Sequence, residues 1–237
     1  MCCHFIVIAR SDIDGMIREV EMGHVPNVLP DWPARRVDAW PGAIVPAIVA
    51  ANTLPENAHV GADAGRGAET PANNCTVNEN PSSTQLMVCD MRWGVPTTWS
   101  KRPLINARFE GALAGLHGAD ANMWTEPLAH HRCVLPAWGF FERRNVLFDF
   151  ADGSPLFLGG VYTNSGFALV TCDPNASVLP YHNRMPLVLQ ACEVPLWMGP
   201  SFAELENRAG LLLRATEEET PHRKISHDTI PGQSSLF

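Results

Sequence analysis

The residue best placed to do chemistry is Cys2, and what it can do depends on the fate of Met1. Methionine removal is favoured when the second residue is small, as cysteine is. Removal would leave an α-amine and a thiol on adjacent carbon atoms, and both groups titrate near enough to neutral pH to act as nucleophiles. Such an aminothiol condenses with an aldehyde to an imine, which the thiol closes to a thiazolidine ring. Position alone is a weak signal, because many chains begin with Met-Cys.

Three further segments contain polar and aromatic residues in a specific order. They are RWGVP with Trp99 and INAR over residues 92–108, RCVLPAWGFFE over residues 132–142, and HNRMP over residues 182–186. Glu142 and His182 provide a carboxylate and an imidazole, whose pKa values can differ enough to divide acid and base roles. Arg108 presents a planar guanidinium that suits phosphate.

Each of these residues also has an ordinary structural explanation. The alternatives are a surface acid for Glu142, a structural histidine for His182, a turn cap for Asn106, core packing for Trp93, and surface ion pairs for Arg108 and Arg184. Taken singly, these alternatives are favoured. The joint pattern reverses the preference.

With a cysteine at position 2, the ordered motifs resemble the SOS response-associated peptidase (SRAP) family. The resemblance runs from Cys2 to about Trp197, apart from an insertion over residues 52–85. INAR and HxRMP, with RCxxPxxGFxE between them, form a specific combined signature.

The resemblance implies roles for the matching residues. Cys2 is expected to be the nucleophile that links covalently to the ring-opened sugar aldehyde of a DNA abasic site. Asn106 is expected to position the terminal residue, Glu142 to orient the α-amine and assist proton transfers, and His182 to act on the sugar hydroxyl or ring oxygen. The expected DNA-binding residues are Arg108 and His4 at phosphates, Arg184 through structure or a backbone contact, and Trp93 and Trp99 against a splayed or kinked strand.

Three single positions and one four-residue segment depart from the family pattern. They are Cys3 in place of Gly, His4 in place of an Arg that would meet phosphate, Arg143 in place of a Trp, and Asp38-Ala39-Trp40-Pro41 near a turn where relatives usually have Asn or Thr. The histidine makes the phosphate contact weaker and pH-dependent, and Arg143 exchanges apolar packing for charge. We expect these changes to affect DNA affinity and to leave the core chemistry intact.

Neither a metal nor a cofactor is expected. The seven cysteines form no CxxC pair and no Cys/His cluster with zinc-finger spacing, and the sequence has no phosphate-binding Gly-rich loop. We interpret four of them as reduced core residues of a cytosolic protein: Cys89, Cys133, Cys172 and Cys192.

The net charge of −8 argues against a general nucleic-acid binder with a basic surface. Residues 90–144 nevertheless hold seven Lys or Arg against five Asp or Glu. This segment can form a modest basic groove, although on charge alone a solvated surface is favoured.

A β-rich framework is expected to position these residues, because 20 Pro, 18 Gly and only 18% charged residues favour turns and short strands. We predict a single α+β domain over residues 1–215, with a mixed, partly barrel-like sheet flanked by short helices. The specific expectations are a strand over 3–10, a helix over 11–22, a mobile surface loop over about 52–85, a strand, turn and strand over 132–143, a hairpin around Asp152-Gly153 and a helix over 202–208.

A polar tail is expected over residues 216–237, and its end, QSSLF, resembles the bacterial sliding-clamp-binding pattern. Leu236 and Phe237, with Gln233, would then anchor the tail in an apolar pocket of the clamp. The alternative is a tail that folds back or stays disordered. No apolar run approaches the length of about 20 residues that spans a bilayer, and no secretory signal is expected.

We therefore predict a cytoplasmic, nucleoid-associated, monomeric DNA-damage response protein, which forms a thiazolidine crosslink with abasic sites in single-stranded DNA. The chemistry is lyase-like, since it passes through an imine. One alternative is a thiol peptidase that uses Cys2, either on its own N-terminus alone or on other peptides as well. Another is a non-catalytic DNA-binding or clamp-binding module.

Overall fold

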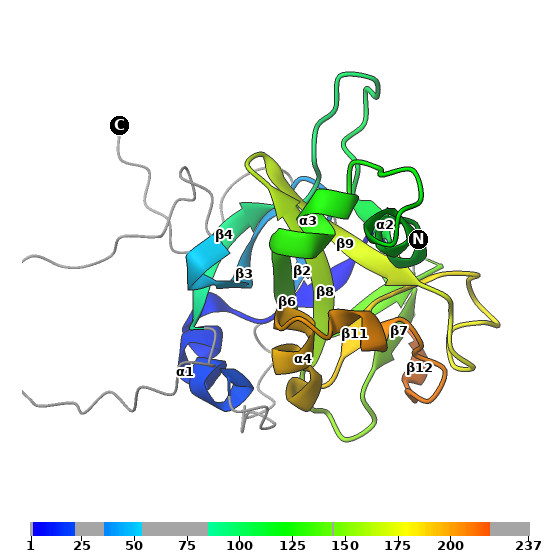
Figure 1. The fold of residues 1–237 in the computed structure, drawn as a ribbon. Coiled ribbons are helices and arrows are strands. Elements are labelled where there is room, and N and C mark those ends of the chain that lie inside the picture. The colour runs from blue at the N-terminus through cyan, green and yellow to red at the C-terminus, as the bar shows by residue number, and fades with distance from the viewer. Residues whose placement is uncertain (1, 22–35, 54–84, 144, 219–237) are drawn as a thin grey trace, which may run out of the picture.

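The structure, a computed structural model, describes residues 2–21, 36–53, 85–143 and 145–218 (Figure 1). It is an α+β fold dominated by one 12-stranded sheet with a few short helices, which confirms the predicted class. The strands are β1 (Phe5–Val7), β2 (Val37–Ala39), β3 (Ile44–Ala50), β4 (Leu86–Arg92), β5 (Asn106–Arg108), β6 (Arg132–Glu142), β7 (Val146–Asp149), β8 (Leu156–Thr163), β9 (Gly166–Cys172), β10 (Met185–Pro186), β11 (Val188–Leu189) and β12 (Arg214–Glu217). The helices are α1 (Arg10–Glu21), α2 (Phe109–Leu116), α3 (Thr125–His130) and α4 (Val194–Met198), with 3-10 turns at Ala51–Thr53, Ala191–Glu193 and Phe202–Leu205.

β6 is the central strand and organises the rest of the sheet. It pairs antiparallel with β8 and β7 in succession, and with β3 and β1 as well. From β8 the sheet continues to β9 and β10, and from β1 it continues to β2. The sheet remains open. Because β6 ends at Glu142 beside β1, the segment from Cys2 to His4 lies near that carboxyl group.

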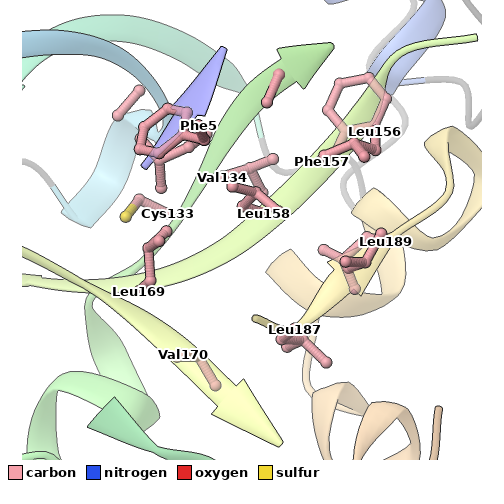
Figure 2. Packing of buried hydrophobic residues seen from close by; sticks show 14 of the residues in the cluster. Phe5, Cys133, Val134, Leu156, Phe157, Leu158, Leu169, Val170, Leu187 and Leu189 are labelled. Carbon is pink, nitrogen blue, oxygen red and sulfur yellow. The ribbon is translucent and has the colours of Figure 1, made fainter. Parts of the chain in front are cut away.

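The hydrophobic core lies against the middle of this sheet. β6, β8 and β9 are buried along nearly their whole lengths, as expected for strands covered on both faces. Figure 2 shows Cys133 of β6 beside Leu169 of β9, on the same face of the sheet across the intervening strand β8. Cys89, Cys133 and Cys172 are buried as expected, while Cys192 is exposed, so its assignment to the core was wrong.

Two local predictions about β6 and its neighbours were wrong. RCVLPAWGFFE is one continuous strand and contains no turn at its proline. Pro136 lies beside the register shift between Ile6 and Val7, where the ladder is irregular and a missing donor is tolerated. β7 and β8 flank the Asp152-Gly153 turn but pair with successive parts of β6 rather than with each other.

The helices are short and pack around the sheet. α1 begins at Arg10, close to the predicted position, and Figure 1 shows it at the opposite end of the molecule from α2. The predicted helix over 202–208 is a 3-10 turn, Phe202–Leu205. Most of the expected loop over 52–85 and most of the tail lie outside the described residues. In the part that is described, no helix has the length and apolar character to cross a membrane.

Candidate functional site

Cys2 lies directly before β1 and is fully buried. Its thiol donates to the carbonyl oxygen of His4 at 3.6 Å. Burial raises the pKa of the Cys2 thiol well above its ordinary value, and the nearby carboxyl of Glu142 raises it further. The sulfur is therefore held as a neutral thiol, and it needs a base before it can attack a carbon atom.

Asn106 holds the backbone of Cys2 in place. It is the first residue of β5, which pairs in parallel with β9, and its Nδ2 donates to the Cys2 carbonyl oxygen at 3.2 Å. Its Oδ1 is buried and has no hydrogen-bond partner among the described residues. An unsatisfied buried acceptor is destabilising by about 1–3 kcal/mol, so this oxygen is suited to accept a hydrogen bond from a donor that the described residues do not provide.

Glu142 ends β6 and is only 4% exposed. β1 runs beside this end of β6, with Phe5 opposite Phe140 and the amide of Phe141 donating to the His4 carbonyl at 2.9 Å. Burial raises the pKa of the Glu142 carboxyl, while the nearby His182 acts on this pKa in the opposite direction. A carboxyl group whose pKa is moved toward neutrality can both take up and release a proton during a reaction.

His182 approaches from the loop between β9 and β10. Its Nδ1 lies 2.9 Å from the Arg184 carbonyl oxygen and 3.0 Å from the Arg184 amide nitrogen. These contacts fix the ring, and they leave Nε2 on the opposite edge. The structure thus brings together the four predicted catalytic residues from four separate segments. Asn106 bonds to the Cys2 carbonyl oxygen. Glu142 lies close enough to influence the pKa of the Cys2 thiol, and His182 lies close enough to influence the pKa of Glu142.

Two of the predicted DNA-binding residues are accessible. Arg108 is exposed at the start of α2, and no hydrogen bond or ion pair engages it within the described chain. Trp99 is 70% exposed. A guanidinium and an indole in these settings are suited to a phosphate and a base, respectively.

His4 does not occupy the expected place at a DNA phosphate. It is 2% exposed, and its ring is stacked between Trp40 and Phe141 with centroid distances of 4.1 and 4.2 Å. Its Nε2 lies 2.6 Å from Asp38 Oδ1. A histidine enclosed in this way stabilises the segment that carries Cys2, so the expected phosphate contact is not supported.

The partners of His4 form a network that the sequence-based prediction missed. Arg36 bonds to both oxygens of Asp38 and, at 3.0 Å, to both oxygens of Glu218. Burial alone would raise the pKa of Asp38, but hydrogen bonds from His4 and Arg36 lower it overall. The available signal was the departure at residues 38–41, which coincides with the departure at His4.

Trp93 lies elsewhere than expected, whereas the contacts of Arg184 agree with the structural one of the two roles expected of it. Trp93 is fully buried, donates from Nε1 to the Ile105 carbonyl oxygen at 2.9 Å and packs against Phe5. It is a core residue and does not face DNA. Arg184 is 12% exposed and directs its guanidinium to Glu110 at 2.8 Å and Asp173 at 3.0 Å, so its role is structural.

A hollow of about 370 Å³ lies at the other end of β6. It is lined by Ala50, Thr53, Ala129, His130, His131, Arg132 and Met198. Arg132 begins β6 and Glu142 ends it, so this hollow is separate from the cluster around Cys2.

Comparison with known proteins gives one family. The sequence model of the SOS response associated peptidase (SRAP) family matches residues 1–229. The abasic site processing protein YedK of Escherichia coli is 32% identical over 122 residues, which are 45% of this chain and 52% of that protein. YoaM of Bacillus subtilis, with the same description, is 27% identical over 158 residues, or 57% of this chain and 67% of that protein. The chain thus spans about half the length of the first of these relatives.

Solved structures show the same fold. A phage-related protein from Bordetella bronchiseptica superposes with a TM-score of 0.57 at 16% identity, over 92% of this chain and 95% of that one. A protein from Bacteroides thetaiotaomicron gives a TM-score of 0.52 at 18% identity, over 91% of both chains.

Proposed function

Because the chain belongs to the SOS response associated peptidase (SRAP) family, we propose that it captures abasic sites in single-stranded DNA through a covalent bond to Cys2. The observation that carries the proposal is the setting of Asn106, whose amide holds the Cys2 carbonyl while its own buried oxygen lacks a donor. An α-amine on Cys2, exposed by loss of Met1, is a donor of the required kind. Two relatives with matching sequence are named abasic site processing proteins, which supports this choice of substrate.

The first step joins the α-amine of Cys2 to the aldehyde carbon of the ring-opened sugar. The carbon–oxygen double bond becomes a hydroxyl, which leaves as water after protonation, and an imine remains. Glu142, with its raised pKa, takes the proton from the attacking amine and returns one to the leaving hydroxyl. His182 assists before this step, by moving a proton at the sugar hydroxyl or ring oxygen during opening.

The second step closes the ring. The Cys2 sulfur bonds to the imine carbon, and the carbon–nitrogen double bond becomes a single bond. The thiol proton passes to the nitrogen by way of Glu142, which is needed because burial keeps the thiol neutral. The net reaction of aldehyde and aminothiol gives a thiazolidine and one water.

The imine also explains the lyase-like character of the reaction. An imine makes the adjacent sugar carbon acidic, so the 3′ phosphate can be lost by elimination and the strand cut. Ring closure by the thiol removes the imine and therefore protects the strand. Capture and protection are thus one reaction.

The test uses an oligonucleotide with one abasic site and the purified full chain, whose intact mass first establishes that Met1 is absent. A denaturing gel should show a stable protein–DNA band with the abasic oligonucleotide and none with the undamaged one. Cys2→Ser keeps the amine and loses the thiol. It should give no stable band, a band after borohydride reduction of the imine, and increased strand scission.

Two results would contradict the proposal. One is the absence of a band from protein that lacks Met1. The other is a stable band from Cys2→Ser as strong as that from the unmodified chain, since serine cannot form a thiazolidine. Asn106→Ala should crosslink more slowly, because it loses the bond that positions Cys2.

A second candidate activity is cysteine-type autoproteolysis of the Met1–Cys2 bond. The family description and the position of the Cys2 thiol beside Glu142 support it. The intact masses of Cys2→Ala and Glu142→Gln, expressed in the same cells, decide it. Retention of Met1 in both variants supports autoproteolysis, and removal in both assigns the step to another enzyme.

The partners proposed here follow from this function. The protein would act as a cytoplasmic monomer that joins the nucleoid when bound to DNA. Gln233, Leu236 and Phe237 would bind a sliding clamp, and they lie outside the described residues. A clamp pull-down that compares the full chain with one lacking residues 233–237 tests this contact, and equal recovery would exclude it.

A further inference from the structure

Arg143 follows Glu142 directly, at the turn where β6 leads into β7. Its φ is +50°, and it is the one residue other than glycine with positive φ in the described chain. A left-handed backbone costs an ordinary residue roughly 1–2 kcal/mol, and glycine or asparagine would avoid most of that cost. An arginine here calls for an explanation from its side chain.

The side chain of Arg143 is anchored at one point only. Its Nε donates to the Tyr181 carbonyl oxygen at 2.7 Å, and Tyr181 immediately precedes His182. The Tyr181 ring is in turn packed edge-on against Phe148, at a centroid distance of 5.5 Å. Arg143 thus joins the turn after Glu142 to the loop that carries His182, and its guanidinium is held in a defined place beside the site.

The two terminal nitrogens of Arg143 take no part in the bond to Tyr181. The residue is exposed, and no acceptor in the described chain bonds to either nitrogen. Other arginines direct their terminal nitrogens to internal carboxylates or carbonyls: Arg36, Arg132, Arg184 and Arg208. An anchored guanidinium with outward donors is pre-organised for an anion, and its planar fork matches phosphate.

Arg143 and Arg108 occupy related positions around Cys2. Arg108 lies two residues after Asn106, which bonds to the Cys2 carbonyl, and Arg143 lies one residue after Glu142, which raises the pKa of the Cys2 thiol. The two cations therefore adjoin residues of the cluster at two different places, the end of β5 and the turn that follows β6. His4 is buried against Asp38 and provides no third cation at the surface.

We propose that Arg143 binds a DNA phosphate adjacent to the abasic nucleotide, in addition to the phosphate expected at Arg108. The proposal rests on the function proposed above. Its specific content is that Arg143 acts on DNA through charge, and that its bond to Tyr181 only holds the guanidinium in position.

The test measures binding of single-stranded DNA that contains a tetrahydrofuran, an abasic analogue with no aldehyde, by fluorescence anisotropy at several salt concentrations. Loss of one phosphate contact lowers the slope of log affinity against log salt by about 0.7 for a single strand. Arg143→Gln should show this decrease, with affinity weaker on the order of tenfold at low salt. Arg143→Lys keeps the charge and should retain the slope.

Two further variants guard against misfolding and general charge effects. Arg143→Gly suits the left-handed backbone, so it should fold at least as stably and still lose the same slope. Arg18→Gln removes an exposed charge from α1, distant from α2, and should leave both slope and affinity unchanged.

An unchanged slope in both Arg143→Gln and Arg143→Gly would overturn the proposal. A slower crosslink at saturating DNA with the salt slope intact would also overturn it, because that result assigns Arg143 to positioning alone. Failure of the unmodified chain to crosslink an aldehyde-containing abasic strand would instead refute the capture reaction, and it would leave the salt slopes as a separate measurement.

Discussion

Replacing Glu142 by glutamine is expected to stabilise the protein while slowing its reaction. Glu142 is 4% exposed, and burial raises the pKa of its carboxyl. At neutral pH the unfolded chain carries this group as a well-hydrated carboxylate, and the folded chain holds it in an environment that disfavours the charge. The amide of glutamine has nearly the same shape and no charge, so it avoids this penalty.

The sign and size of the effect follow from proton linkage. A raised pKa in the folded state means that stability falls as pH rises from the ordinary range of a glutamate to the folded value, and is then constant. Each unit of that difference corresponds to about 1.4 kcal/mol. For a chain of this size, each kcal/mol changes Tm by roughly 2–4 °C. Glu142→Gln should therefore melt roughly 3–6 °C higher per unit at neutral pH, and at the same temperature as the unmodified protein in acid.

The assay is a set of thermal melts of both proteins from acidic to neutral pH, together with crosslinking rates. The rate should fall by about 10²–10⁴ if Glu142 moves the protons of imine formation. Glu142→Asn, which shortens the side chain, is the control for packing. A Glu142→Gln protein that is less stable at neutral pH, or whose advantage does not grow with pH, would refute the reasoning about burial.

Three other predictions concern residues whose burial and partners the structure shows. Trp93→Ala should lower the free energy of unfolding by about 3–5 kcal/mol in urea titrations, whereas Trp99→Ala should leave it nearly unchanged and weaken single-strand binding by about 1–3 kcal/mol; equal stability losses would contradict this. Asp38→Ala leaves buried His4 without its acceptor and should destabilise by about 3–5 kcal/mol at neutral pH. Because the folded pKa of Asp38 is lowered, this difference should shrink as pH falls below the ordinary aspartate value toward the folded one. A constant difference would argue against the hydrogen bonds from His4 and Arg36 to the Asp38 carboxylate. Arg184→Ala should lower Tm without changing the salt slope of DNA binding, and a reduced slope would restore its predicted role at DNA.

The fold class was predictable, and part of its detail was not. Short apolar runs separated by Pro and Gly indicate strands, and together with the few short helices that the sequence predicts they indicate an α+β fold. The continuity of β6 was not predicted, because a proline in the middle of a sequence segment usually indicates a turn. A proline breaks a strand only where the neighbouring strand needs a hydrogen bond from the missing N–H group. The irregular pairing of β6 with β1 shows that β1 needs no such hydrogen bond from Pro136.

By itself, the sequence determined which residues form the cluster. Cys2, Asn106, Glu142 and His182 occur in short motifs whose order and spacing are specific, because the proposed chemistry requires those residue types. The motifs also predict that these four residues lie together. They contain no information about the surroundings of each side chain.

Only the tertiary structure decided which of the flanking residues are exposed and which are buried. His4 and Trp93 are enclosed by strands and side chains distant in the sequence, and Trp99 and Arg143 are exposed. Residue type does not fix this outcome, because burial depends on which strands pair and in what register. A long arginine side chain can pair with a carboxylate of the protein or with a phosphate outside it, depending on which of them lies within its reach.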